Sequence, residues 1–63
     1  MATIETRNEQ GELVAATGET PSELSESLAA LGVPGTHRVT FCDCDEACSH
    51  QSFFVSATAW RAA

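Results

Sequence analysis

Residues Thr20-Pro21-Ser22-Glu23 open the stretch that decides the fold, which runs to Pro34 and reads TPSELSESLAALGVP. Thr20 is suited to cap a helix, and Pro21 fits the first helical position because its missing N–H has no partner there. Glu23 lies three residues after the cap and completes a capping box. The stretch therefore predicts a helix that begins at Pro21.

An apolar stripe follows along this predicted helix. Leu24, Leu28 and Leu31 recur at the spacing that places side chains on one helical face. Gly32 is typical of the left-handed residue that ends a helix, and Val33 is then placed to pack back on Leu28. The helix is expected to end at Leu31 and to bury one face.

Alternating segments on both sides of the helix predict β-hairpins. Residues 3–7 and 12–17 flank Asn8-Glu9-Gln10-Gly11, which suits a type I turn. After the helix, residues 36–44 and 52–60 again alternate between apolar and polar side chains. The chain order is therefore ββαββ, and we predict an α+β fold of two layers, in which two antiparallel hairpins form a sheet with the amphipathic helix packed on one face.

The predicted registers assign side chains to faces. The first turn sets Thr6 opposite Leu13 and Ile4 opposite Ala15, so Ile4, Leu13 and Ala15 are expected to face inward. Alternation through the last segment places Trp60 on the polar side, away from the core.

Length and charge limit the classes of function. A chain of 63 residues is expected to form one small domain, 1–63, with a thin core that needs a metal, a disulfide or a partner subunit. A formal net charge of −6 disfavours nucleic-acid binding, which requires clustered basic side chains. Neither a membrane-spanning run nor a signal-peptide pattern is evident, so we expect a cytoplasmic protein.

Three cysteines and a histidine concentrate within nine positions, as Cys42, Cys44, Cys48 and His50. Residues two apart on a strand share a face, so a loop at 45–47 would set Cys44 opposite Cys48 and Cys42 opposite His50. Three thiolates and one imidazole are a known ligand set for structural zinc. The sequence therefore predicts a closed Zn²⁺ site with these four ligands.

Two other interpretations of the cysteines stay open. A disulfide between Cys44 and Cys48 would suit an oxidising compartment and leave Cys42 unpaired. Alternatively, all three are thiols whose reactivity the neighbouring acidic residues reduce.

Phe54 and Trp60 are predicted to share the sheet face that the helix does not cover. Exposed aromatic clusters mark interaction surfaces, so we expect another protein, most simply a second copy in a homodimer, to cover them.

The expected function is a small acidic, non-catalytic interaction module, because the chain lacks the phosphate-loop, nucleophile-elbow and metalloprotease motifs of enzymes. Such compact acidic chains are common among bacterial and phage accessory proteins. Two alternatives are a thiol-based metal or redox sensor and a charge-mimic inhibitor of a basic or nucleic-acid-binding protein.

Overall fold

The predicted α+β fold class is confirmed. The computed structural model describes residues 1–43 and 49–63, with only the backbone described at 42, 43 and 49. Within these ranges the elements follow the order β1 (Ala2–Arg7), β2 (Leu13–Gly18), α1 (Pro21–Leu31), β3 (His37–Asp43), β4 (Ser49–Val55) and β5 (Trp60–Ala62). The short strand β5 extends the predicted ββαββ order by one element.

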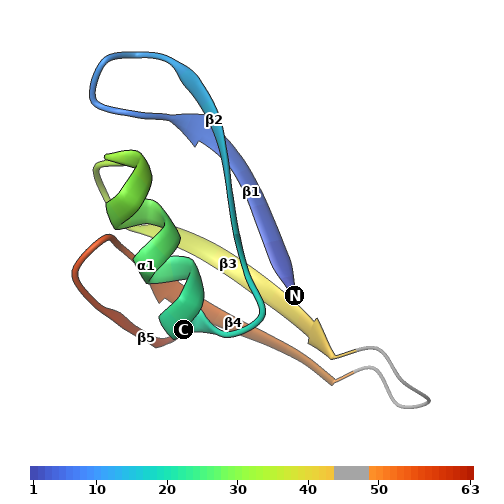
Figure 1. Cartoon of the computed structure of the whole chain (residues 1–63). Coiled ribbons are helices and arrows are strands. Elements are labelled where there is room, and N and C mark those ends of the chain that lie inside the picture. Colours follow the sequence, from blue (N-terminus) through green and yellow to red (C-terminus); the bar gives the residue numbers. More distant parts are fainter. Residues whose placement is uncertain (44–48) are drawn as a thin grey trace.

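The strands form two antiparallel sheets, where the sequence predicted one. β1 pairs with β2, and the second sheet has the order β3-β4-β5. β1 lies beside β3, and α1 packs against β2, β4 and β5 (Figure 1). The helix therefore joins the two sheets through one shared apolar layer.

Helix α1 begins and ends at the predicted residues. The Thr20 side chain accepts a hydrogen bond of 3.2 Å from the Glu23 backbone N–H. Gly32 has φ +68°, and the Val33 N–H donates to the Leu28 carbonyl at 3.0 Å, as expected for a Schellman-type end. The helix has 11 residues, and no helix in the described ranges is long and apolar enough to cross a membrane.

The core lies between α1 and the inner faces of the strands. Leu24, Leu28 and Val55 are fully buried, and partly buried Phe53 packs against this cluster. The other buried apolar residues are Ala2, Ala16, Val33, Val39 and Phe41. The apolar side chains of this small core therefore come from both sheets and the helix.

The predicted register of the first hairpin is wrong by one residue. Thr6 pairs with Val14 and Ile4 with Ala16, so Leu13 faces outward and is 67% exposed. Gly11 has φ +81° directly after the turn, and this extra left-handed residue shifts the partner strand, as in a G1 bulge. A one-residue shift moves every β2 side chain to the opposite face.

Gly18 marks the closest approach between strand β2 and the helix. A Cβ at this position would lie 2.4 Å from the Leu24 backbone nitrogen and 2.9 Å from the Glu23 carbonyl carbon. Nearby, the Thr17 N–H donates to the Ser27 hydroxyl at 3.3 Å. The end of β2 is thus pressed against the first turn of α1.

Candidate functional site

The second hairpin brings one predicted pair of zinc ligands opposite each other in the backbone. Cys42 and His50 are Cα partners on β3 and β4, and Asp43 pairs with Ser49 beyond them. This confirms the predicted register of Cys42 against His50. Cross-strand partners have Cβ atoms about 4.5–5.5 Å apart, a separation from which two side chains on one face reach a shared ligand.

The rest of the predicted zinc site lies outside the described residues. This applies to Cys44, Cys48 and the side chain of Cys42, whereas His50 is described and exposed. Among the described residues, no group of three or more His, Cys, Asp or Glu side chains is placed to hold a metal ion. The four-ligand Zn²⁺ site therefore stays a prediction that rests on spacing and on the Cys42–His50 register.

Phe54 and Trp60 lie on opposite faces of the three-stranded sheet, which corrects the predicted shared face. Val55 pairs with Trp60, whose ring packs edge-to-face on Phe53 with centroids 5.9 Å apart. Phe54 instead pairs with Arg61, whose guanidinium carbon lies 4.7 Å from the centre of the phenyl ring. The chain turns between Val55 and Trp60, so alternation counted straight through this segment assigns Trp60 to the wrong side.

This turn is held by a serine and attached to the helix. The Ser56 N–H donates to the Ala59 carbonyl at 2.8 Å, and the Ala59 N–H donates to the Ser56 hydroxyl at 3.2 Å. From α1, the buried Ser25 hydroxyl donates to the Ser56 carbonyl at 2.6 Å. These bonds fix the position of β5 and Trp60 relative to the helix.

Phe54 and Trp60 meet at a small open cleft at the β5 end of the sheet. The cleft has a volume of about 110 Å³ and is lined by Thr36, Phe54, Ser56, Ala59, Trp60 and Arg61. Trp60 is 48% exposed, and Phe54 is half-buried. Although their rings lie on different faces, the two predicted interaction residues therefore border one cavity.

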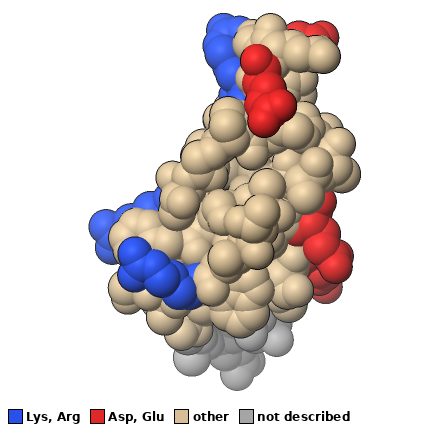
Figure 2. All heavy atoms as spheres, turned by 90° about the vertical axis from the view of Figure 1, so that its left-hand side faces the viewer, with Lys and Arg blue, Asp and Glu red and all other residues tan. Residues whose placement is uncertain are grey.

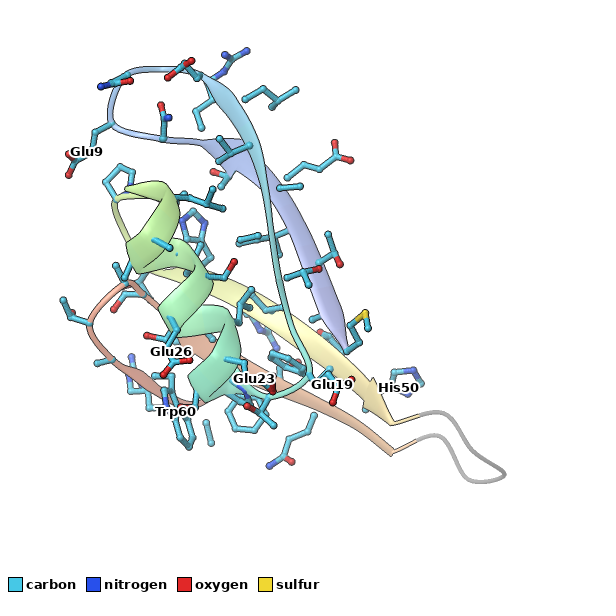
Figure 3. All side chains as sticks on the ribbon, in the orientation of Figure 1. Glu9, Glu19, Glu23, Glu26, His50 and Trp60 are labelled. Atoms are coloured by element: carbon cyan, nitrogen blue, oxygen red, sulfur yellow. The ribbon has the colours of Figure 1, made fainter. Side chains whose placement is uncertain are left out.

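His50, the predicted zinc ligand whose side chain is described, and the predicted interaction residue Trp60 lie at opposite ends of the second sheet. His50 is next to the tip of the second hairpin, and Trp60 is at the other end of the sheet (Figure 3). A ligand at one end would therefore leave the other end accessible.

Three features of this region were not predicted from the sequence. They are the strand β5, the buried Ser25 contact and the row of Arg38, Phe54 and Arg61 across the second sheet. No clear signal in the sequence marks β5, because Ser56-Ala57-Thr58-Ala59 contains no glycine or proline to mark the turn before it.

Comparison with protein-family models, with curated proteins and with solved structures found no match to this chain.

Proposed function

We propose that this protein is a small, non-catalytic interaction module that binds another protein through the β5 end of its second sheet. The observation that carries the proposal is the cleft of about 110 Å³ bordered by Phe54 and the half-exposed Trp60. Trp and Arg are enriched among residues that dominate binding energy, and Arg61 lines the same cleft.

The anchoring of this end also supports a binding role. Ser25 and Ser56 attach the β5 turn to the helix, and Phe53 supports the Trp60 ring from the core side. A surface that is ordered before binding loses less conformational entropy on association. The His37 ring nitrogen lies 3.2 Å from the Pro34 carbonyl, a contact that suits a structural role for this histidine.

The experiment compares partner capture by the native chain and by two variants. Trp60→Ala should abolish capture of a specific protein, whereas Leu13→Ala removes a more exposed apolar side chain on β2 and should leave capture unchanged. Binding is then measured by titration of the purified partner. Equal binding by both variants would refute the proposed surface.

A second copy of this chain is the simplest partner to test. Light scattering at two protein concentrations reports whether the chain forms a homodimer, and Trp60→Ala should return it to a monomer if Trp60 lies in the interface. A monomer at both concentrations would direct the search to a different protein.

We also propose that one structural Zn²⁺ stabilises the second hairpin through Cys42, Cys44, Cys48 and His50, in a reducing cytoplasm. The Cys-x-Cys-x3-Cys-x-His spacing and the pairing of Cys42 with His50 support this site. A metal that binds only the folded chain adds to the free energy of unfolding, and this contribution is a large share of the total when the hydrophobic core is small.

Native mass spectrometry with and without a chelator tests the metal. One zinc per chain is expected, and its removal or the substitution Cys44→Ser should destabilise the fold by several kcal/mol. A reduced protein purified without stoichiometric zinc would overturn the site. Stoichiometric zinc whose removal leaves the melting temperature unchanged would favour the metal or redox sensor.

A further inference from the structure

The outer face of the second sheet, the side turned away from α1, is basic although the whole chain is acidic. Arg38 pairs with Phe54, and Phe54 pairs with Arg61, so the two arginines flank one aromatic ring across three adjacent strands. Neighbouring strands are about 4.8 Å apart, which places the two arginine Cα atoms about 10 Å from each other. Two of the three basic residues of the chain thus lie in one row.

Both guanidinium groups are available for an external partner as far as the described residues show. Arg61 lies over the Phe54 ring, and Arg38 is exposed. Neither donates a hydrogen bond to, or forms an ion pair with, any other described residue, whereas Arg7 donates to the Gly11 carbonyl at 2.6 Å. Stacking on an aromatic ring orients a guanidinium while leaving its N–H donors free to bind a carboxylate.

Polar side chains continue along the described outer face toward the far end of β4. The Thr40 and Ser52 hydroxyls lie 3.0 Å apart in the next row, and the exposed His50 follows at the far end of β4. The carboxylates whose side chains are described lie elsewhere, at Glu5, Glu9, Glu12, Glu19, Glu23 and Glu26, on the first hairpin and around the start of α1. In Figure 2 the basic side chains lie along the left of the molecule, while acidic side chains lie on the right and at the top, where they are beside a basic one.

We propose that this outer face binds an extended, acidic peptide segment of the partner protein, with its carboxylates on Arg38 and Arg61 and its apolar side chains against Phe54 and the cleft beside Trp60. The inference rests on the proposed interaction function and adds the chemistry of the partner. Arginine forks bind carboxylates in a bidentate manner, and complementary charge selects partners.

Charge argues against two other occupants of this face. A second copy packed on it about a two-fold axis through the Arg38–Phe54–Arg61 row would place arginines of the two copies against each other, and like charges repel. The phosphates of a nucleic acid would be repelled by a chain with a net charge of −6. Two arginines would also release few counterions from the nucleic acid, so they would contribute little to its binding.

Fluorescence anisotropy of a labelled peptide of repeating Glu-Ser-Leu-Ser, which places Glu and Leu on one face when extended, tests the proposal, with the matching Gln-Ser-Leu-Ser peptide as the control for charge. The native chain should bind the Glu peptide and not the Gln peptide. Arg61→Gln or Arg38→Gln should weaken binding about fivefold, in keeping with one exposed but oriented ion pair. Arg7→Gln makes the same change in net charge on the first hairpin and should have no effect.

Arg61→Lys serves as a second variant that keeps the charge, and it should bind more tightly than Arg61→Gln. Circular dichroism checks that each variant folds. Equal binding of both peptides, equal weakening by Arg7→Gln, no measurable binding, or tighter binding of a single-stranded oligothymidine would each overturn the inference. If the acidic peptide fails while Trp60→Ala still abolishes capture of a protein partner, the proposed function stands and only the acidic partner is wrong.

Discussion

Gly18→Ala should destabilise the protein severely, because the new methyl group would meet backbone atoms. Its Cβ would lie 2.4 Å from the Leu24 nitrogen, 2.8 Å from the Leu24 Cα and 2.9 Å from the Glu23 carbonyl carbon. Ordinary contact begins at 3.4 Å, so the shortest of these distances is about 1 Å too small. A rotamer change cannot relieve contacts with backbone, and α1 must move away from β2.

The magnitude follows from what that movement disturbs. Leu24 and Leu28 are fully buried, and shifting their helix opens the core on which both sheets pack. Overpacking of a core reduces the free energy of unfolding by about 1–3 kcal/mol. Replacing glycine by alanine also lowers the entropy of the unfolded chain, which offsets about 0.4–1 kcal/mol of that loss. Because backbone atoms cannot yield, we expect the upper end of this range, a net loss of about 2 kcal/mol.

Urea denaturation followed by far-UV circular dichroism measures this loss, with Gly35→Ala as the matched control. At Gly35 a Cβ would meet nothing within 4 Å, but the residue has φ +83° and the substitution should cost about 1–2 kcal/mol through backbone strain alone. For a domain of this size, about 2 kcal/mol corresponds to a fall in melting temperature of roughly 8–16 °C. A Gly18→Ala protein within about 0.5 kcal/mol of the native chain would refute the close packing of β2 on α1.

Substitutions at four further positions test the cap, the register and the attachment of β5 by the same denaturation assay. Thr20→Ala should cost about 1 kcal/mol through loss of the helix cap, and Thr20→Ser should be close to neutral. Leu28→Ala should reduce the free energy of unfolding by about 2–5 kcal/mol, whereas Leu13→Ala should change it by less than about 0.5 kcal/mol. A large effect at Leu13 would mean that this side chain is buried, as in the register predicted from the sequence. Ser25→Ala should cost about 1–2 kcal/mol because the Ser56 carbonyl loses its donor, and a neutral result would show that this bond does not hold the turn.

The helix could be predicted to the residue because its determinants are local. Thr20 and Glu23 are three residues apart, and the Gly32 ending depends on neighbours within one turn. Capping chemistry acts over such distances whatever the rest of the chain does. The register of Cys42 against His50 was also predictable, because the two residues are close in the sequence.

The two errors of strand assignment have a common physical origin. In the first hairpin, the left-handed residue Gly11 adds one residue to the turn and shifts the register of β2 by one. In the second sheet, the turn at 56–59 places Trp60 on the same face as Val55. Alternation assigns faces only within one uninterrupted strand, and a single added residue exchanges the inner and outer sets. Leu13 and Trp60 were therefore assigned to the wrong sides although their segments were correctly identified as extended.

By itself the sequence determined the α+β class, the ends of the helix and the clustering of the cysteines, because each depends on residue types at short spacing. Only the tertiary structure decided that Arg38, Phe54 and Arg61 form one row and that Gly18 must lack a side chain. Those features join residues from different strands or a strand and the helix. The row depends on the turn that brings β5 beside β4, and the requirement at Gly18 depends on how β2 packs against α1; the spacing of residues along the chain specifies neither.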